Sequence, residues 1–279
     1  TLSSGTGTKT VYAKFKDVAG IWSEVYSDTI ILENPDITPP VTTASGIDGL
    51  WHNQPVTVTL TASDVGIPPS TPDAYTKLLL HFNGADGSTK FTDETGKTVT
   101  VHGNAQIGTS ESKFGGASGL FDGTGDYLSL ADSNDWNFGT GDFTIDFWVR
   151  FNSTVNAQSL YDQTVGSNYV SIYWDEIYMN FVARSDGTFV AQYRFPGNFS
   201  ANTWYHLAFV RSGTSFYMFL DGTLMPYTTF DAIGSNSMPD LAAQLDIGYV
   251  SAWGGRYYNG WLDEFRISKG IARTFSNVS

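Results

Sequence analysis

The sequence predicts an all-β protein, and three observations support that prediction. Aromatic residues make up 15% of the 279 residues and glycine occurs 29 times, a composition that favours short strands and tight turns. Charged residues also reach only 15%, which argues against long solvated helices. Apolar and polar residues alternate with period two along many runs, and this is the pattern of strands with two different faces.

The bulk properties exclude several function classes. The formal net charge of -13 and the pI near 4.5 would repel phosphate backbones, so we expect no nucleic-acid partner. The excess of acidic residues is instead suited to divalent cations. The chain contains no cysteine, which excludes disulfides and thiol chemistry. No apolar run approaches the roughly 18 residues of a membrane helix, so we expect no membrane insertion.

Residues 113–151 carry the clearest strand pattern. Apolar residues flank a turn at 122–126, DGTGD, where glycines can take a positive φ without a Cβ clash. This predicts two strands with a hairpin turn. In 143–150 four apolar residues alternate with polar or amphipathic ones, Thr144, Asp146, Trp148 and Arg150. We expect the apolar set to face a core and the other set to form a second, partly polar surface.

The first 73 residues contain strand patterns interrupted by proline. Residues 10–31 read as a hairpin that turns at 17–20. A proline-rich joint at 33–40 cannot continue a sheet and predicts a module boundary. Alternation resumes in 41–64, and a second proline-rich linker follows at 65–73.

We therefore expect three parts, at residues 1–36, 37–73 and 74–279. The first two hold incomplete sets of strands, and isolated hairpins are marginally stable in water. They could pair with each other, pack on the large part, or accept strands from another subunit by edge addition. The last arrangement would generate a homo-polymer, because a head-to-tail contact does not close.

The large part is expected to consist of regular short strands. The Asp221-Gly222 dipeptide is the strongest two-residue hairpin signal in it. One helical turn is expected near 268–272. Strands are predicted at residues 78–82, 98–107, 159–161, 169–174, 177–183, 189–195, 204–211, 215–220, 223–227, 245–249 and 261–267.

Several motifs in the sequence resemble those of known families. HFNGADGSTKFTDETG, SKFGGASGLFDGTGDYLSL, FTIDFWVRF, WYHLAFVRSG with YMFLDG, and GWLDEFRISKGIAR follow one another over residues 74–273. In this order they resemble the laminin-G-like branch of the concanavalin A-like lectin/glucanase superfamily. The resemblance implies a jelly-roll sandwich of two antiparallel sheets, one convex and one concave. KFKDVAGIWS and residues 41–64 resemble parts of bacterial immunoglobulin-like surface modules, which implies a small amino-terminal Ig-like β region.

Catalysis is not expected. Glucanases of this superfamily carry a Glu-x-Asp-x-x-Glu run on one strand, which the chain lacks. A retaining hydrolase needs two carboxyls roughly 5 to 5.5 Å apart. The nearest acidic pairs have the wrong spacing, and adjacent strand residues point to opposite faces. These pairs are Asp142/Asp146, Asp175/Glu176 and Asp263/Glu264.

Glycine and aspartate turns offer ligands for calcium, which binds six to eight oxygens from carboxylates and carbonyls. The candidates are Asn83, Asp86, Asp122, Asp126 and Asp263. The resemblance maps Asp263 and the Asn83 region to positions where related jelly-roll modules bind a structural Ca2+. Asn83 stands where related sequences often have aspartate, which removes one charge. The alternative is that these side chains cap turns through hydrogen bonds to the backbone.

Carbohydrate binding requires flat aromatic faces beside polar groups that satisfy sugar hydroxyls. The glycine-rich stretch 249–261 is the best candidate, because large aromatics there have no obvious core to fill. The alternative is that aromatics in a sandwich belong to the core. The candidates are Trp253, Arg256, Tyr257 and Tyr258 in this stretch, with Tyr173, Trp174, Asp175, Tyr193 and Arg194, which could line the concave sheet.

These observations lead to two hypotheses. In the first, the chain is an extracellular, non-catalytic carbohydrate-binding or adhesion module of a bacterial or phage surface protein, whose partner is a glycan or a surface protein. In the second, it is a structural subunit of an extracellular filament or appendage, assembled through the amino-terminal β region by strand exchange. Both hypotheses imply a location outside the cell or on a cell or virion surface.

Overall fold

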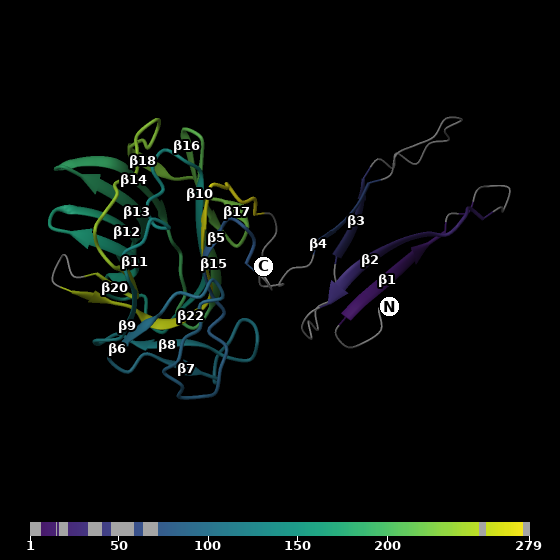
Figure 1. Ribbon diagram of the computed structural model, residues 1–279, viewed down its shortest axis with the longest axis horizontal. Helices are drawn as coiled ribbons and strands as arrows, with labels where there is room; N and C mark the ends of the chain where they lie inside the picture. The colour runs from purple at the N-terminus through teal and green to yellow at the C-terminus, as the bar shows by residue number, and fades with distance from the viewer. Residues whose placement is uncertain are drawn as a thin grey trace. The chain divides into compact units, whose positions relative to one another are not determined.

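The computed structural model describes residues 7–14, 16, 22–32, 41–45, 59–63, 72–250 and 255–275. Every regular element in these residues is a β-strand, so the all-β prediction is confirmed (Figure 1). No helix suited to crossing a membrane is present in the described ranges. The expected turn at 17–20 and joint at 33–40 lie outside the described residues, as does most of the linker at 65–73. The chain divides into two compact units, Thr1–Ser70 and Thr71–Ser279.

The first unit contains two separate antiparallel ladders. Strand β1 (Gly7–Ala13) pairs with β2 (Tyr26–Leu32), and β3 (Val41–Ser45) pairs with β4 (Thr59–Ser63). Within the described residues no ladder joins the two pairs. The expectation that both segments form strands is confirmed, and their resemblance to Ig-like modules stays a prediction.

The second unit is a sandwich of two eight-stranded antiparallel sheets. The first, here named the β10 sheet, runs in the order β17-β16-β15-β10-β22-β8-β7, with β5 also paired to β22. Its strands are β5 (Thr76–Leu80), β7 (Gln106–Gly108), β8 (Ser118–Asp122), β10 (Phe143–Phe151), β15 (Trp204–Ser212), β16 (Ser215–Leu220), β17 (Thr223–Leu224) and β22 (Asn259–Lys269). The expected hairpin at Asp221-Gly222 is confirmed, because Leu220 pairs with Thr223.

The second sheet, here named the β12 sheet, runs in the order β18-β14-β13-β12-β11-β19-β9-β6 and faces the β10 sheet (Figure 1). Its strands are β6 (Thr100–His102), β9 (Tyr127–Leu130), β11 (Gln158–Val165), β12 (Asn168–Trp174), β13 (Tyr178–Ser185), β14 (Thr188–Pro196), β18 (Thr228–Asp231) and β19 (Leu245–Ile247). A short separate ladder joins β20 (Tyr249–Val250) to β21 (Arg256–Tyr257). This two-layer arrangement is the expected jelly-roll sandwich.

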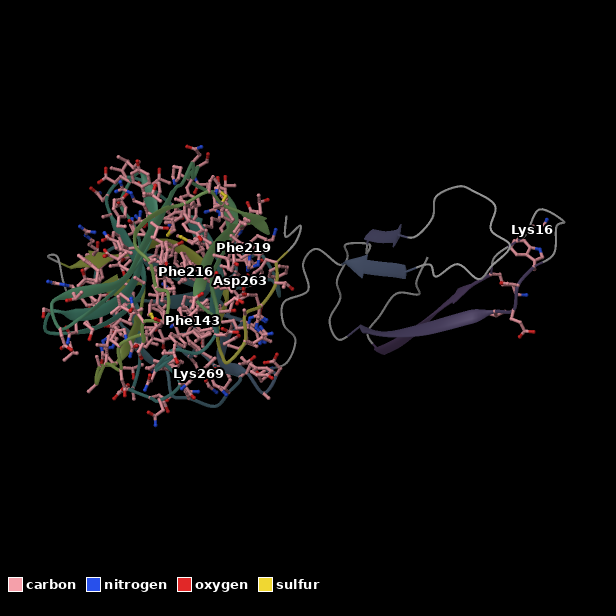
Figure 2. The ribbon with its side chains drawn as sticks, turned by 90° about the horizontal axis from the view of Figure 1, so that it is seen from above. Lys16, Phe143, Phe216, Phe219, Asp263 and Lys269 are labelled. Carbon is pink, nitrogen blue, oxygen red and sulfur yellow. The ribbon has the colours of Figure 1, made fainter. Side chains whose placement is uncertain are left out.

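The core lies between the two sheets and is rich in phenylalanine. Phe147 stacks on Phe265 with ring centroids 4.8 Å apart, and Phe143 stacks on Phe181 across the two sheets at 6.0 Å. Figure 2 labels Phe143 and Phe216 among these packed side chains. Since aromatic rings bury a large apolar area, this layer supplies most of the driving force for folding.

Two predicted elements in the amino-terminal half of the sandwich are wrong in the same way. The expected strand 98–107 is two strands, β6 in the β12 sheet and β7 in the β10 sheet, with a break at Gly103. The expected hairpin at 122–126 connects β8 in the β10 sheet to β9 in the β12 sheet, so the chain crosses between the sheets there. The Asp126 carboxylate joins both crossings by accepting the N–H groups of Asn104 (2.6 Å) and Asp122 (2.9 Å). Gly103 has φ +66°, and a Cβ there would lie 2.6 Å from the Gly125 carbonyl oxygen. Only glycine fits this close approach.

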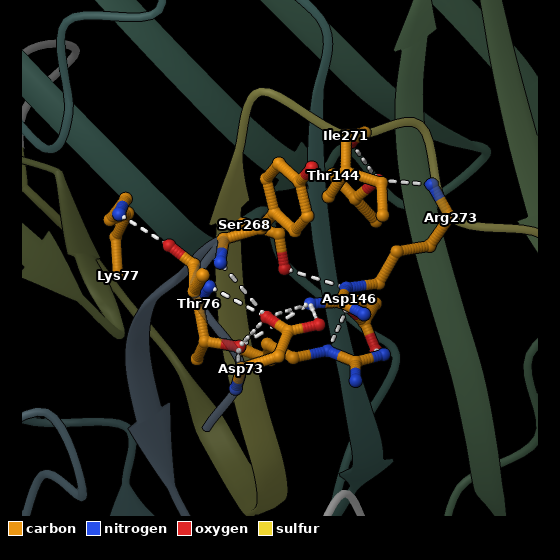
Figure 3. Close-up of polar contacts among 11 residues, drawn as sticks. Asp73, Thr76, Lys77, Thr144, Asp146, Ser268, Ile271 and Arg273 are labelled. Atoms are coloured by element: carbon orange, nitrogen blue, oxygen red, sulfur yellow. Dashed lines mark hydrogen bonds and ion pairs between the residues drawn. The ribbon is translucent and has the colours of Figure 1, made fainter.

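The helical turn expected at 268–272 is also wrong. Strand β22 continues to Lys269, and Gly270 then takes φ +87°, which a helix does not allow. The chain next runs along the outer face of the β10 sheet, where Thr144 donates to the Ile271 carbonyl and accepts from the Arg273 N–H (Figure 3).

The polar face of β10 is buried, which corrects the expectation of a partly polar surface. Asp146, Trp148 and Arg150 are all at most 9% exposed. Arg266 forms a bidentate ion pair with Asp146, with Nε–Oδ1 and Nη2–Oδ2 distances of 2.9 and 2.8 Å. The Phe114 ring covers Trp148 edge-on at 5.6 Å. The outer face of this sheet is therefore closed by the protein's own segments.

Candidate functional site

The outer face of the β12 sheet carries the side chains that alternate with core residues. The strand register places Ser129, Asp246, Asp162 and Ser171 in one row across β9, β19, β11 and β12. Laterally paired residues point to the same face of a sheet. All four are at most 9% exposed, so larger neighbours shield the row from solvent.

Two carboxyl groups stand side by side in this row. Asp162 accepts hydrogen bonds from Ser171 and from Thr164 (2.7 Å), and Asp246 accepts one from Gln244 (2.7 Å). Burial raises the pKa of Asp162 to about 7, and the charge of Asp246 adds to the increase. Burial likewise raises the pKa of Asp246 to about 6. Near neutral pH the pair can therefore both donate and accept hydrogen bonds.

A cluster of aromatic rings borders the row where β9 meets the β20–β21 ladder. The rings of His102 and Tyr127 stack in parallel, with centroids 3.9 Å apart. Tyr127 contacts Tyr249 at 4.7 Å, and Tyr249 stacks on Tyr257 at 4.6 Å. These side chains are half-buried on the outer face. We name His102, Tyr127, Tyr249 and Tyr257 the tyrosine cluster.

Arginines and aromatic rings alternate along another row of the same face. Tyr173, Asn180 and Arg194 pair laterally across β12, β13 and β14. The Arg256 guanidinium lies over the Tyr173 ring, 5.6 Å from its centroid. The Arg194 guanidinium lies between the rings of Tyr178 (4.1 Å) and Phe230 (4.6 Å). We name Tyr173, Arg194 and Arg256 the arginine row.

The structure brings some of the predicted carbohydrate-binding residues together. Arg256 and Tyr257 lie in β21 and belong to the arginine row and the tyrosine cluster, respectively. Tyr173 and Arg194 lie on the same face. Trp253 lies outside the described residues.

The other predicted residues have structural contacts. Trp174 and Tyr258 are at most 2% exposed and pack against Phe151. The Tyr258 hydroxyl oxygen lies 2.9 Å from the carbonyl oxygens of both Arg150 and Trp261 and donates its hydrogen bond to them. Tyr193 is 3% exposed and lies in the core. Rings without an exposed face cannot stack on a sugar, so these three residues fit the core alternative.

Asp175 caps the turn between β12 and β13. One of its carboxylate oxygens accepts the N–H groups of Ile177 (3.1 Å) and Tyr178 (2.6 Å). The other accepts from the Asn180 amide at 3.0 Å. Asp175 therefore shapes the end of the arginine row and retains only a limited capacity to accept further hydrogen bonds.

Asp263 is the metal candidate with an unpaired oxygen. Its Oδ2 accepts the N–H groups of Lys113 and Phe114, both at 2.9 Å, whereas its fully buried Oδ1 has no hydrogen-bond partner. Burial raises the pKa of Asp263 well above its usual range. The Asn83 amide lies beside the same segment, since a Cβ at Gly115 would come 2.0 Å from Asn83 Oδ1. Calcium takes six to eight oxygens, of which Asp263 Oδ1 and the Asn83 amide oxygen could supply two.

The remaining metal candidates fit the turn-capping alternative. Asp86 accepts the Thr109 N–H at 2.9 Å. Asp122 accepts the Thr124 N–H at 2.7 Å, and both Asp126 oxygens accept backbone N–H groups. No group of three or more aspartate, glutamate, histidine or cysteine side chains suited to a metal occurs in the described part of the chain.

A β-bulge corrects one step of the sequence reasoning. Asp263 and Glu264 were expected to point to opposite faces, but Glu264 and Phe265 both stand opposite Phe147, and Glu264 has φ +50°. The bulge occurs where the neighbour of β22 changes from β8 to β5. Phe265 still reaches the core, and Glu264 binds His81 Nδ1 at 2.8 Å.

Sequence reasoning missed the two acids at the centre of the face. Asp162 lies beyond the expected strand 159–161, which continues to Val165 in the structure. Asp246 lies within an expected strand, and its pairing with Asp162 joins residues 84 positions apart (246 minus 162). The sequence did contain a signal for both acids, which is the alternation of side chains along a strand. Each acid lies between two residues whose side chains point into the sandwich, so the acid itself must point to the outer face.

Solved structures with a similar fold include toxin and glycan-binding domains. The binding domain of botulinum neurotoxin serotype G is 13% identical, with a TM-score of 0.53 over 70% of this chain and 48% of that domain. The receptor binding domain of a botulinum neurotoxin C/D mosaic serotype is 12% identical, with a TM-score of 0.55 over 71% of this chain and 49% of that domain. The chain thus spans about half the length of these domains.

Domain 4 of an extracellular arabinanase from Geobacillus stearothermophilus, solved in complex with arabinotriose, is also similar. It is 17% identical, with a TM-score of 0.50 over 71% of this chain and 95% of that domain. At such identities the similarity establishes the fold alone. Among curated proteins, none matches the chain in sequence.

A family model described as the concanavalin A-like lectin/glucanases superfamily matches residues 122–279, more than half of the chain. The matched region includes the whole of β10 to β22 and hence both carboxyl groups, the arginine row and most of the tyrosine cluster. The two-sheet antiparallel sandwich agrees with this match. The chain therefore belongs to the concanavalin A-like lectin/glucanases superfamily.

Proposed function

We propose that residues 71–279 form an extracellular, non-catalytic carbohydrate-binding module that binds sugar rings on the outer face of the β12 sheet. The observation that carries this proposal is the tyrosine cluster. Its rings stack on one another outside the core, and each of its three tyrosines carries a hydroxyl group beside its flat face. Stacking surfaces next to hydrogen-bonding groups are the combination that carbohydrate recognition requires.

Comparison of the two sheets supports the choice of face. The outer face of the β10 sheet is occupied by the ion pair between Asp146 and Arg266 and by the covering residue Phe114. On the β12 sheet, Tyr127, Tyr249 and Tyr257 keep part of their surface in solvent. The arabinanase domain, which has a similar fold and was solved with arabinotriose, supports the ligand class, and its extracellular origin supports the location.

Replacing Tyr257 with alanine is expected to weaken binding of any sugar selected on a glycan array by tenfold or more. The Tyr257 ring stacks on Tyr249 at 4.6 Å and offers its remaining surface to ligand. Losing one aromatic stacking partner costs about 0.5 to 1.5 kcal/mol, in addition to the free energy of the apolar area that is no longer buried. Titration calorimetry with the selected sugar measures the change.

Tyr75 provides a matched control, because it is 46% exposed and belongs to the segment that leads into the β10 sheet. The Tyr75→Ala variant should bind as the wild type does. Equal affinities of the Tyr257→Ala variant and the wild type would contradict the assignment of the site. The absence of any array signal for the wild type would contradict carbohydrate binding itself.

We also propose a structural calcium ion that is bound by Asp263 Oδ1 and the Asn83 side chain. The unpaired buried oxygen of Asp263 supports this proposal. Two features weaken the affinity. Asn83 is neutral, and the Lys113 ammonium is close enough to Asp263 for their charges to interact. The ion would hold segment 113–116 against β22.

Calcium at 10 mM is expected to raise the melting temperature by about 3 °C. A site with a dissociation constant of about 1 mM would stabilise the protein by about 1.4 kcal/mol at this concentration, and a domain of this size gains about 2 to 4 °C per kcal/mol. Differential scanning fluorimetry measures the shift. The Asp263→Asn variant should lose it and the Asp86→Asn variant should retain it. An equal shift in both variants would contradict the site.

A further inference from the structure

We propose that the outer face of the β12 sheet carries a second sugar-binding site, in which a sugar ring stacks on the exposed side of Phe230. The polar side chains around this ring, Gln192, Arg194 and Asp231, bind the hydroxyl groups of the sugar. The site lies where β14 pairs with β18, at the opposite end of the sheet from β6 and the tyrosine cluster. It adds a different set of residues to the proposed carbohydrate-binding function, on which it rests.

Phe230 has one covered side and one open side. It is the extra residue of a β-bulge, because the residues before and after it in β18 stand opposite two adjacent residues of β14. Bulges change the direction of a side chain, and here the ring lies against the Arg194 guanidinium, 4.6 Å from the ring centroid. Phe230 is nonetheless 49% exposed. Among the described strands β18 ends the sheet on this side, so no further strand pairs with it there (Figure 1).

Single exposed apolar side chains are common on protein surfaces, so the polar neighbours of Phe230 decide the matter. The Arg194 guanidinium lies between the rings of Phe230 and Tyr178, and its carbon is 4.1 Å from the Tyr178 centroid. Contact with a ring on each side holds the guanidinium plane in place. Its buried Nε–H has no partner, and its side chain forms no hydrogen bond or ion pair with any other described residue. Arg194 therefore retains unused donors in a fixed position beside the phenyl ring.

Gln192 and Asp231 provide an amide and a carboxylate at the same place. They stand opposite each other in the ladder of β14 and β18, and laterally paired side chains lie on the same face of a sheet. Gln192 also shares this face with Arg194, because Tyr193 between them belongs to the core. Both side chains are half-buried, and in the part of the chain that the structure describes neither has a hydrogen-bond partner. Both are therefore available to a ligand that lies on Phe230.

The chemistry of these groups selects an uncharged ligand that is rich in hydroxyls. The Asp231 carboxylate repels an anion, and the Arg194 guanidinium repels a cation. An apolar partner would bury the amide and both charges without hydrogen bonds, which is unfavourable. A hydroxyl both donates and accepts, so neighbouring hydroxyls of one sugar can bind the carboxylate and the guanidinium together. The C–H face of the same sugar ring can then stack on Phe230.

The distance between the two sites makes them independent for a short ligand. In the order of the β12 sheet, five strand spacings separate β14 from β9, which carries Tyr127 of the tyrosine cluster. At the usual spacing of about 4.8 Å this is about 24 Å along the sheet, farther than one sugar ring reaches. A long glycan that occupies both sites gains affinity, because its second contact is intramolecular.

An array of defined neutral oligosaccharides, arabinotriose among them, tests the proposal on the whole chain and its variants. The Phe230→Ala variant should bind at least one of the array sugars about tenfold more weakly than the wild type, because the stacking ring is lost. Gln192→Ala should weaken binding of the same sugar about fivefold, since one hydrogen bond is lost. Phe230→Trp keeps an aromatic face and should retain binding. Titration calorimetry with the affected sugar measures each change.

Leu224 provides a matched control for the loss of an exposed apolar side chain. It is 51% exposed and lies in β17, which ends the order of the β10 sheet as β18 ends that of the β12 sheet. The Leu224→Ala variant should bind every array sugar as the wild type does. Because Phe230 and Leu224 are both exposed, both alanine variants should also melt close to the wild-type temperature, which shows that any loss of binding is local.

The outcomes separate this inference from the function on which it rests. If the wild type binds array sugars and both Phe230→Ala and Gln192→Ala bind them equally well, the second site is wrong while carbohydrate binding stands. If Phe230→Ala loses binding and Tyr257→Ala does not, the second site is supported and the assignment of the tyrosine cluster is wrong. If the wild type gives no signal with any sugar, both proposals are wrong.

Discussion

Replacing Arg266 with methionine is expected to lower the free energy of unfolding by about 3 to 5 kcal/mol. Asp146 is 4% exposed, and although desolvation acts to raise its pKa, the charges and hydrogen bonds of Arg266 and His206 together lower it. Without the guanidinium, the carboxylate keeps only His206 as a basic neighbour, with His206 Nε2 at 3.5 Å. A buried charge without its main partner destabilises the folded state strongly. Urea unfolding at pH 7 measures the loss.

Arg273, in the segment that follows β22, offers a control. It also pairs with an aspartate, Asp73, at 2.8 Å, but the Asp73 side chain is 45% exposed (Figure 3). Solvent-exposed ion pairs contribute about 0 to 1 kcal/mol, so the Arg273→Gln variant should lose little. The Asp146→Leu/Arg266→Met double variant should recover much of the stability lost by Arg266→Met, because it leaves no buried charge. Equal losses for Arg266→Met and Arg273→Gln would contradict this account.

The strands of the sandwich could be predicted from the sequence because their signals are local. The alternation in 143–151 correctly assigned Phe143, Ile145, Phe147 and Val149 to the core. The dipeptide Asp221-Gly222 likewise fixed a hairpin through its own backbone preferences. Such signals do not depend on what lies elsewhere in the chain.

The errors concern features that depend on distant partners. The turn at 122–126 has the composition of a hairpin, but β8 and β9 pair with strands from other parts of the chain. A turn that connects two sheets requires glycines just as a turn between two neighbouring strands of one sheet does, so the composition does not distinguish them. The polar face of β10 was expected to be a surface because residues 111–114 and 271–275, which contact it, are remote in sequence.

The residues of the candidate site likewise fall into those that local sequence indicates and those that depend on distant partners. The glycine-rich stretch 249–261 led to the prediction of Arg256 and Tyr257, because aromatics in a loop lack a local core. Both residues are half-buried beside the outer face of the β12 sheet, and their role in binding stays a prediction. Tyr258 follows them directly but is buried, and no property of the stretch alone distinguishes it. The two central carboxyl groups could not be found, because their pairing brings together strands β11 and β19.

Replacing Asp162 with asparagine is expected to increase the free energy of unfolding at pH 8 by about 2 to 4 kcal/mol. Burial raises the pKa of Asp162 from 3.8 to about 7, and the like charge of Asp246 adds to the increase. The folded state therefore binds more protons than the unfolded chain between roughly pH 4 and pH 7. The stability that Asp162 contributes is complete below pH 4 and is lost as the pH rises through 7. Asparagine carries no charge at any of these pH values and so avoids the loss.

The pH profile distinguishes this effect from a general change in packing. The advantage of Asp162→Asn should be near zero at pH 4, grow across pH 4 to 7 and stay constant above, because only the wild type has the Asp162 carboxyl that titrates in that window, whereas Asp246 titrates in both proteins. Ser171 and Thr164 can hydrogen-bond the amide as they do the carboxyl. Asp132→Asn, in an exposed loop, should follow the wild-type profile. A constant offset at all pH values would mean that packing, rather than the buried charge, separates the two proteins. The expected profile would instead mean that the row at the centre of the outer face of the β12 sheet becomes negatively charged near neutral pH.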